Sequence, residues 1–422
     1  MQALFSRSAF LASILFLFAF ALSVTSLAQS RPQRPEPSTK GEGKRNQRPL
    51  PKTEEELKKE EEDRKRLEEE KKAIEEPGVL TVETDIVNVD AVVYNKKTGQ
   101  IITGLKKENF AIFENGVKQN ISSFTTPEAP ITVSLVLEYS KWTETFGQAN
   151  GGYFEPGVYE SVRPVAQFLS KFIKPPGDFA SVIAFDMRPA VITDFTNDPA
   201  RIHQTIELLL RNSPAFRENN LYDAIRFSLI GGNSESDFVD GAKQRSVAYG
   251  GMVDVKSKRK AIILVASGID TFSKINFGEV RKIVQEGGVP IYIISTGNLF
   301  CKKYCDSSAM DPSRVMPGMP DRMSFLTATN QLKTFAKESG GGYYEMTFPS
   351  EIPTYLNNIN AFLRSQYSLA YDIEVPHEAG KKYKLEVKVD VDGDGTYDDK
   401  VYIVQHRPFV TSPKTVEPKL KN

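Results

Sequence analysis

Three short runs of the sequence are almost wholly apolar, a pattern typical of strands in a sheet that is covered on both faces. They lie at 132–137, 260–265 and 290–294, with a further strand pattern at 179–185. Segments with helical periodicity alternate with these runs, at 162–174, 199–210, 221–229, 277–286, 323–338 and 350–365. Apolar strands that alternate with helices predict a doubly wound α/β domain with a mostly parallel sheet, which we place at 131–365.

Strands of a different kind precede and follow this region. Residues 82–94 alternate apolar and polar side chains, and 110–116 end in an Asn-Gly hairpin signal. Further alternating strands are predicted at 367–375, 383–391 and 397–404. The two β segments, 79–130 and 366–410, are short for independent domains. We therefore expect them to pair into one small all-β sandwich, with the α/β domain inserted between them.

The first residues have the pattern of a secretory signal peptide. Arg7 is the only charged residue before Arg31, and an apolar run leads to small residues in front of a cut after Ala28. The pattern predicts a signal peptide at 1–28 and an exported protein, periplasmic or extracellular, with no membrane span after cleavage. An uncleaved anchor is the alternative, because the 23 uncharged residues 8–30 could cross ~30 Å of hydrocarbon.

Two polar segments separate the signal peptide from the β strands. Residues 29–52 are rich in proline and basic side chains, and we expect a disordered linker. Residues 53–76 contain six acid-first pairs at i,i+4, which predict a charged helix. A dimerising coiled coil is the alternative interpretation. The only large apolar residues, too few for a heptad seam, are Leu57, Leu67 and Ile74.

Composition and motifs argue against several classes of function. Lys+Arg and Asp+Glu are both 54, so no basic excess recruits nucleic acid. The three histidines are widely separated, and the sequence lacks a phosphate loop, a nucleophile elbow and a dinucleotide fingerprint. We expect a protein that is not an enzyme. The alternative is a secreted hydrolase that uses the carboxylates of Glu138, Asp223 and Asp270.

Several short motifs occur together and in one order. They are GLKKENF at 104–110, ENGVKQNI at 114–121, LYDA at 221–224, FAKESGG at 335–341 and LRSQYSLAY at 363–371. Over roughly 79–408 the chain thereby resembles the acidobacterial von Willebrand factor A-related domain proteins. This resemblance implies a doubly wound fold that binds its ligands above the carboxyl ends of the strands. It also implies an adhesion or protein-binding module.

The same resemblance implies where a metal-ion-dependent adhesion site would lie. The family pattern is Asp-x-Ser-x-Ser after the first strand, a Thr from a later loop and an Asp after the central strand, which together hold Mg²⁺. The corresponding positions here are Glu138, Ser140, Trp142, Asn219 and Ser267. Three donor types are altered, and Lys141 adds a positive charge. We therefore expect a degenerate site that binds its partner without magnesium, and a working metal site is the alternative.

A protein partner is expected at the rim formed by 138–159, 215–220, 266–272 and 297–322. Trp142 is either a binding anchor on this rim or a core residue. The rim includes a predicted Met/Pro/Gly-rich loop, 297–322, that contains both cysteines. In an exported protein Cys301 and Cys305 most simply form a disulfide, with free thiols as the alternative. Nothing in the sequence fixes an oligomeric state.

An acidic motif near the end of the chain has the spacing of a calcium loop. Asp390, Asp392, Asp394 and Asp398 place carboxylates at positions 1, 3, 5 and 9, with Gly395 at position 6. Position 12 is Val401 rather than the glutamate of an EF-hand, so the motif is closer to short calcium loops of β hairpins. The alternative is an acidic hairpin turn that holds no ion.

Overall fold

The computed structural model describes most of the chain after residue 85. The described residues are 86–141, 143, 148–150, 153–155, 157–212, 214, 216–235, 246–257, 259–305, 320–373 and 376–411. The signal peptide, linker and charged helix predicted within 1–76 lie outside them, as does Trp142. The chain divides into two compact units, 1–81 and 82–422, and all described residues belong to the second. No helix among the described residues is long and apolar enough to cross a membrane.

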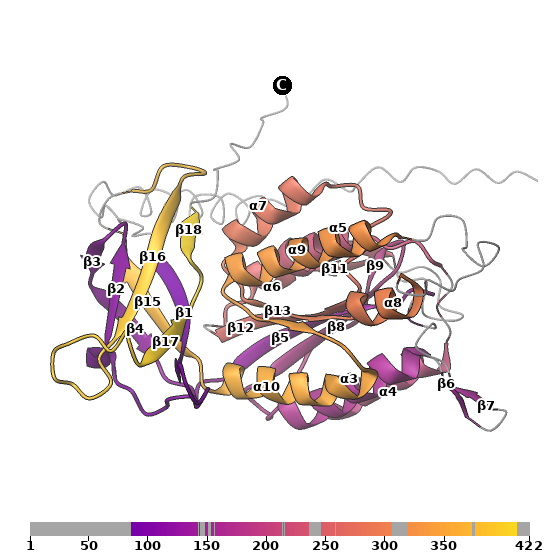
Figure 1. Ribbon diagram of the computed structural model, residues 1–422, viewed down its shortest axis with the longest axis horizontal. Coiled ribbons are helices and arrows are strands. Elements are labelled where there is room, and N and C mark those ends of the chain that lie inside the picture. Colours follow the sequence, from indigo (N-terminus) through magenta and orange to yellow (C-terminus); the bar gives the residue numbers. More distant parts are fainter. Residues whose placement is uncertain are drawn as a thin grey trace, which may run out of the picture. The chain divides into compact units, whose positions relative to one another are not determined.

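A six-stranded sheet forms the centre of the α/β region (Figure 1). Its strands, in spatial order, are β14 (Tyr343–Glu345), β13 (Ile291–Ser295), β12 (Arg259–Ala266), β5 (Ile131–Glu138), β8 (Phe179–Phe185) and β9 (Pro189–Thr196). The first five are parallel, and β9 is antiparallel to β8 at the edge. All eight residues of β5 are buried, because neighbouring strands flank it and helices cover both faces. The predicted mostly parallel sheet is confirmed.

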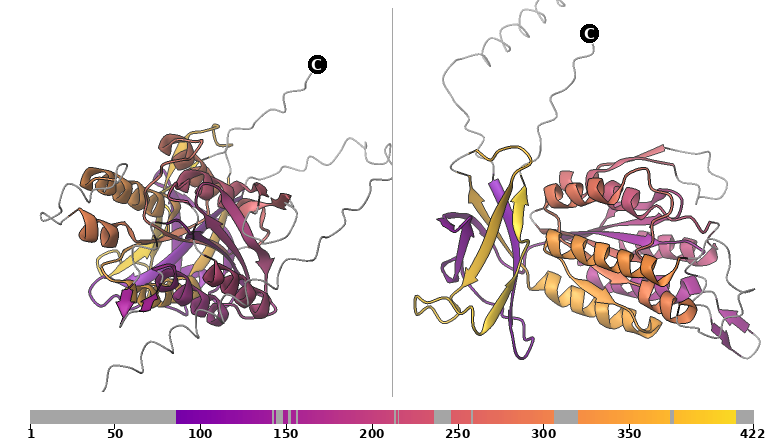
Figure 2. Two further views of the ribbon diagram at one scale, coloured as in Figure 1. Left: turned by 90° about the vertical axis from the view of Figure 1, so that its right-hand side faces the viewer. Right: turned by 45° about the horizontal axis from the view of Figure 1, so that its top comes forward.

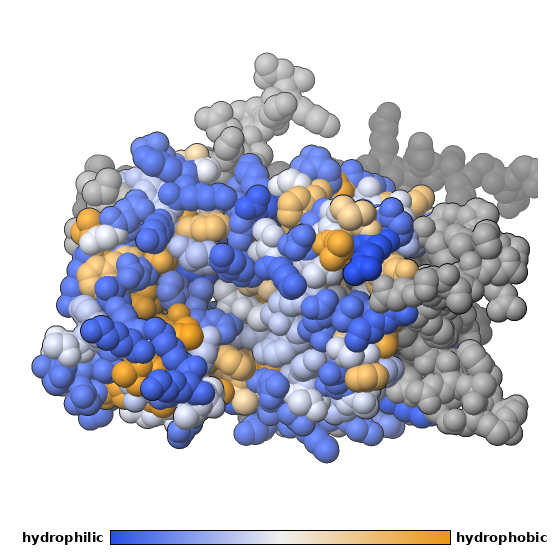
Figure 3. Space-filling view, in the orientation of Figure 1, coloured by the Kyte–Doolittle hydropathy of each residue, from blue (hydrophilic) through white to orange (hydrophobic). Residues whose placement is uncertain are grey.

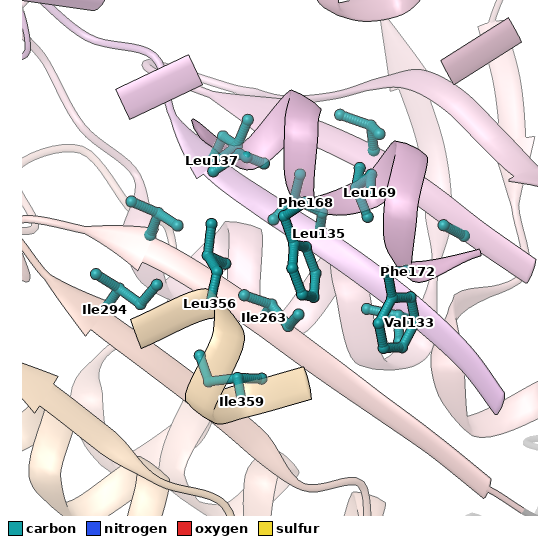
Figure 4. Close-up of a cluster of buried hydrophobic side chains, with 14 of the residues drawn as sticks. Val133, Leu135, Leu137, Phe168, Leu169, Phe172, Ile263, Ile294, Leu356 and Ile359 are labelled. Carbon is teal, nitrogen blue, oxygen red and sulfur yellow. The ribbon is translucent and has the colours of Figure 1, made fainter. Parts of the chain in front are cut away.

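Helices lie on both faces of this sheet (Figures 1 and 2). One face carries α3 (Gly157–Phe172), α4 (Pro199–Arg211) and α10 (Ile352–Arg364). The other face carries α5 (Leu221–Ile230), α6 (Gly251–Asp254), α7 (Phe277–Gly287) and α9 (Arg322–Ser339). Because successive residues of a strand point to opposite faces, Leu135 packs with α3 and α10 (Figure 4), whereas Val136 packs with the α5 side. The sheet therefore separates two hydrophobic cores.

Local sequence signals set most helix ends. Asp198 caps α4 by accepting a hydrogen bond from the backbone N–H of Ala200, and Asn276 and Glu279 form a capping box at the start of α7. Gly340 ends α9 in the left-handed conformation, with φ 84°. These helices lie within two residues of their predicted bounds; α3 begins five residues before the predicted 162.

Two four-stranded sheets combine strands from both ends of the described chain. One has the order β17 (Tyr402–Gln405), β1 (Ile86–Asn95), β15 (Tyr367–Asp372), β4 (Ile121–Thr125). The other has the order β18 (Phe409–Thr411), β16 (Lys382–Val389), β2 (Phe110–Glu114), β3 (Val117–Gln119). Apolar residues of both sheets, such as Val89 and Ile112, belong to a single buried cluster. The β2–β3 hairpin turns at Asn115 (φ 48°) and Gly116 (φ 86°), as the Asn-Gly signal predicted.

A buried arginine holds both connections between the small sheets and the α/β region. Arg259, at the start of β12, is fully buried. Its guanidinium donates to the backbone carbonyls of Pro127 and Ala129, which lie between β4 and β5, and of Leu363, at the end of α10. An arginine can satisfy three carbonyls at once because it carries five N–H donors.

Some predicted elements were wrong. The loop predicted at 297–322 begins with a helix, α8 (Gly297–Tyr304), because Phe300 packs against Phe325 of α9 and favours a helical turn. The strand predicted at 397–404 is reduced to β17, since the chain before it forms turns around the acidic motif. The strand pattern also missed β9, whose Pro189 and Asp194 break the apolar run. The strands β4, β14 and β18 and the short helix α6 were not predicted either. Other short elements that were not predicted are β6 (Gln148–Asn150), β7 (Tyr153–Glu155), β10 (Gly232–Glu235), β11 (Ser246–Tyr249) and the 3-10 helices η1 (Lys107–Asn109) and η4 (Pro349–Glu351).

Candidate binding site at the carboxyl edge of the sheet

Glu138 is the centre of a polar cluster at the carboxyl ends of β5 and β12. Its Oε1 accepts a hydrogen bond from the hydroxyl of Ser140 at 2.9 Å, and its Oε2 accepts one from the backbone N–H of Ser267 at 2.5 Å. Neighbouring parallel strands end at the same edge of a sheet, so residues 129 positions apart meet here. Glu138, Ser140 and Ser267 are all buried.

Burial decides the electrostatics of this carboxyl group. Removal from water raises the pKa of Glu138, and the hydrogen bonds from Ser267 and Ser140 and the nearby amide of Asn219 only partly offset that effect. Lys141, the positive charge noted in the sequence, has an exposed side chain. The cluster is therefore stabilised by neutral hydrogen-bond donors.

Asn219 completes the cluster from the loop before α5. The residue is fully buried, and neither its amide oxygen nor its amide nitrogen has a hydrogen-bond partner of ordinary geometry. The amide is nevertheless close enough to Glu138 to lower the pKa of that carboxyl group. Its backbone carbonyl accepts from the N–H groups of Thr271 and Phe272, and its own N–H donates to the Thr271 hydroxyl at 2.8 Å. The four degenerate adhesion-site positions thus lie together.

This donor set does not fit a magnesium ion. Mg²⁺ requires near-octahedral oxygen ligands at ~2.0–2.1 Å and is usually held by carboxylates. Both oxygens of Glu138 already accept hydrogen bonds from protein donors, and the hydroxyl of Ser140 is one of those donors. Ser267 supplies no second carboxylate. A cation here would have to displace the bonds that compensate for the burial of Glu138.

Hydrogen bonds between loops fix the rim around this cluster. The backbone N–H of Asn220 donates to the Asp186 carbonyl at 2.8 Å, which ties the end of β8 to the start of α5. Asp270 accepts from the backbone N–H of Tyr222 and from the hydroxyl of Ser273, and burial raises the pKa of its carboxyl group. The roles of the Asp186 carbonyl and of Ser273 were not predicted from the sequence. The only indication in the sequence was that each is a polar residue in the loop that follows an apolar strand.

No described histidine lies with the rim carboxylates proposed for a hydrolase. His203 is on α4, His377 bonds the Glu114 carboxylate at 2.8 Å, and His406 contacts the Arg407 carbonyl at 2.6 Å. The carboxylate of Asp223 instead accepts from the backbone N–H of Lys274 at 2.9 Å. These described contacts hold loops in place.

Helix α8 adds a covalently closed segment to the rim. It follows β13 directly, and Cys301 and Cys305 are joined by a disulfide. The ring of Phe300 lies 5.1 Å from that of Phe325, and both belong to a small buried cluster with Ile269. The disulfide therefore closes a helix that packs on α9. Residues 306–319 of the same segment lie outside the described residues.

The acidic motif between β16 and β17 brings three of its four aspartates together. Asp390, Asp392 and Asp398 each offer a carboxylate oxygen within 4.8 Å of the others. Asp394 is not in this group, because its carboxylate accepts from the backbone N–H and hydroxyl of Thr396. The carboxylate of Asp390 accepts from the N–H groups of Gly393 and Gly395, both in positive-φ conformations. These bonds give the turn its shape.

Comparisons with known proteins yield solved structures at low identity. Proximal thread matrix protein 1 from the mussel byssus matches 60% of this chain at 10% identity, with a TM-score of 0.37; the match spans 51% of that chain, about half its length. The hypothetical protein BatB from Bacteroides thetaiotaomicron matches 55% of this chain and 99% of its own, at 14% identity and a TM-score of 0.34. The vWF domain of the type V pili tip protein Mfa5 from Porphyromonas gingivalis matches 56% of this chain and 95% of its own, at 12% identity and a TM-score of 0.36. No family model and no curated protein matches the sequence. The fold assignment rests on the strand order and helices of this chain.

Proposed function

We propose that this protein is an exported, non-enzymatic protein-binding or adhesion module of the von Willebrand factor A-related type, which binds its partner without magnesium. The observation that carries the proposal is the Glu138 cluster at the carboxyl edge of the sheet. In a doubly wound fold this edge is where ligands bind. The cluster is closed by the protein's own donors, Ser140 and Ser267, rather than left open for a cation.

The chemistry of the rim favours binding over hydrolysis. A hydrolase needs a nucleophile or water placed between a general acid and a general base. Among the described residues Glu138, Asp223 and Asp270 each accept hydrogen bonds from serine or backbone donors instead. On the face drawn in Figure 3, hydrophilic residues predominate where described residues are visible, and hydrophobic ones form separate patches. On the rim itself, exposed charged side chains such as Arg226 and Lys274 suit a partner recognised by hydrogen bonds and charge.

The proposal includes how the rest of the chain is organised. Residues 79–130 and 366–410 would form one sandwich that carries the inserted α/β domain, and the antiparallel pairing of β1 with β15 and of β2 with β16 supports this. Signal cleavage after Ala28 would release the protein outside the cytoplasm. The linker 29–52 and helix 53–76 would then act as a spacer.

We further propose that Asp390, Asp392 and Asp398 bind calcium. Three carboxylates within 4.8 Å repel one another, and a divalent cation would remove that repulsion. Asp394 would join them only if it exchanged its bonds to Thr396 for the ion. The turn connects β16 of one small sheet to β17 of the other, so calcium would stiffen this connection rather than contact the Glu138 cluster.

A capture experiment tests the binding function. The full chain, immobilised, is exposed to an extract of the native cell envelope in the presence of Mg²⁺ and again in the presence of EDTA. We expect the same protein to be retained in both. The variant Glu138→Lys, which places an unpaired buried cation in the cluster, should abolish capture. Glu207→Lys, at a partly exposed position of α4, should not. Capture that disappears with EDTA would contradict the metal-free part, and failure to retain any protein would contradict the function.

A further inference from the structure

An open cleft of about 880 Å³ lies beside the start of α5. Its walls come from four segments: the β8–β9 turn with Arg188, the first turns of α5 with Asp223 and Arg226, the start of β10, and the loop after β12 with Phe272 and Lys274. None of the four residues of the Glu138 cluster lines it. The cleft is therefore a separate site on the same rim.

The lining of this cleft has an excess of positive charge. Arg188, Arg226 and Lys274 are basic, and Asp223 is the only acidic residue among the lining residues. All three basic side chains are exposed. Within the described part of the chain, no hydrogen bond or ion pair involves the side chains of Arg226 and Lys274. These two cations are available to an anionic group, even though the chain as a whole carries no net charge.

The cleft also offers an aromatic surface on a fixed backbone. Phe272 is 51% exposed, an unusual position for a phenylalanine among charged side chains. Its backbone N–H donates to the Asn219 carbonyl at 3.0 Å, so the loop that carries the ring is tied to the Glu138 cluster. Elsewhere in the lining, the side-chain amide of Asn220 donates to the Met187 carbonyl at 2.8 Å. The walls are thus pre-organised.

We propose that this cleft binds an acidic peptide segment of the protein partner, with Arg226 and Lys274 contacting its carboxylates and Phe272 packing against an adjacent aromatic side chain. The proposal rests on the protein-binding function proposed above and names the chemistry of the partner. Arginine pairs with a carboxylate through two parallel hydrogen bonds, and lysine adds a point charge. The two available cations, Arg226 and Lys274, suit one or two carboxylates, whereas a nucleic-acid backbone requires a longer basic track.

Peptide binding to the full chain tests the assignment. The probe is a fluorescein-labelled peptide of repeated Glu-Phe-Gly units, compared with matched Gln-Phe-Gly and Lys-Phe-Gly peptides by fluorescence anisotropy. We expect the Glu peptide alone to bind, with an affinity that falls as salt is added. The double variant Arg226→Gln/Lys274→Gln should weaken binding at least tenfold. A control variant with the same charge change, Lys171→Gln/Arg201→Gln, alters exposed residues of α3 and α4 and should bind like the parent.

A second substitution tests the aromatic contact and guards against misfolding. Phe272→Ser should weaken binding of the Glu-Phe-Gly peptide but leave a Glu-Ser-Gly peptide unaffected, which a general loss of structure would not do. The proposal would be overturned by any of three results. The Arg226/Lys274 double variant binds the Glu peptide as tightly as the parent does, the parent binds the Gln peptide as tightly as the Glu peptide, or the parent does not bind the Glu peptide. If the envelope partner is captured equally by parent and double variant, the cleft assignment fails while the binding function stands. If the Glu peptide binds but no envelope protein is captured, the cleft assignment stands and the proposed binding function fails.

Discussion

Asp90 lies in β1, opposite Ser368 of β15, in a position that makes the stability of the protein depend on pH. Burial raises the pKa of this carboxyl group from 3.8 to about 6, although the hydroxyl of Ser368 donates to it and Arg407 and Arg259 attract its charge. Ionised Asp90 is therefore a cost to the folded state. Asp90→Asn should remove that cost at neutral pH and should keep an oxygen that accepts from Ser368.

The magnitude follows from the difference between the two pKa values. A difference of about 2 pKa units corresponds to about 3 kcal/mol at 1.36 kcal/mol per unit. The Asp90 side chain retains some exposure, so solvent screening should reduce the effect to about 1–2 kcal/mol. Because the pKa of Asp90 is raised in the folded state, the free energy of unfolding falls as the pH rises. The stability of the protonated form is fully present below the unfolded pKa of 3.8 and is lost as pH rises through about 6.

Urea denaturation of parent and variant between pH 4 and pH 8 measures this effect. We expect the two proteins to unfold with equal free energies near pH 4 and Asp90→Asn to be more stable by about 1–2 kcal/mol at pH 8. Asp372→Asn is the matched control, because Asp372 is exposed on the same pair of strands and accepts from Ser122. A variant that is less stable than the parent at pH 8 would refute the reasoning. It would mean that attraction to Arg407 outweighs burial.

Four further predictions concern the metal sites, the amino terminus and one glycine. Millimolar Ca²⁺ should raise the melting temperature of the parent but not of Asp392→Ala, and an unmoved melting point would leave only an acidic turn. Titration calorimetry of the full chain with Mg²⁺ and Mn²⁺ should detect no binding at micromolar affinity. A variant that carries Glu138→Asp, Trp142→Ser and Ser267→Asp restores the metal ligands and serves as the comparison. Micromolar binding by the parent would return the protein to the metal-dependent class. Amino-terminal sequencing of the exported protein should begin near Gln29, and an intact Met1 would indicate an anchor. Gly341→Ala should destabilise the fold by more than about 2 kcal/mol in urea denaturation, because a Cβ there would collide with the carbonyl of Ile291, whereas Gly99→Ala, in open space, should cost less.

Local patterns in the sequence were enough to predict the central layers of the α/β region. The run at 132–137 has apolar residues at 133, 135 and 137 on one face and Val136 on the other, which favours a strand buried on both faces, and β5 is that strand. Helix ends were predictable where a single residue imposes the geometry, as Asp198 and Gly340 do. Helix α8 was missed because its apolar contact, Phe325, comes from a distant helix.

The candidate sites depended on tertiary structure to a greater degree. The sequence indicated which residues replace the adhesion-site ligands, but only the register of β5 against β12 places Glu138 on the backbone N–H of Ser267 and so decides which group satisfies the carboxylate. The cleft at Arg226 and Lys274 has no sequence motif at all, because its walls come from four separate segments of the chain. In the acidic motif, the spacing of the four aspartates predicted that all of them would bind one ion. In the folded turn, the carboxylate of Asp394 instead accepts a hydrogen bond from Thr396. The periodicity of apolar residues indicates which side chains of a single helix or strand are buried. Contacts between residues of different elements depend on how those elements pack, which this periodicity does not specify.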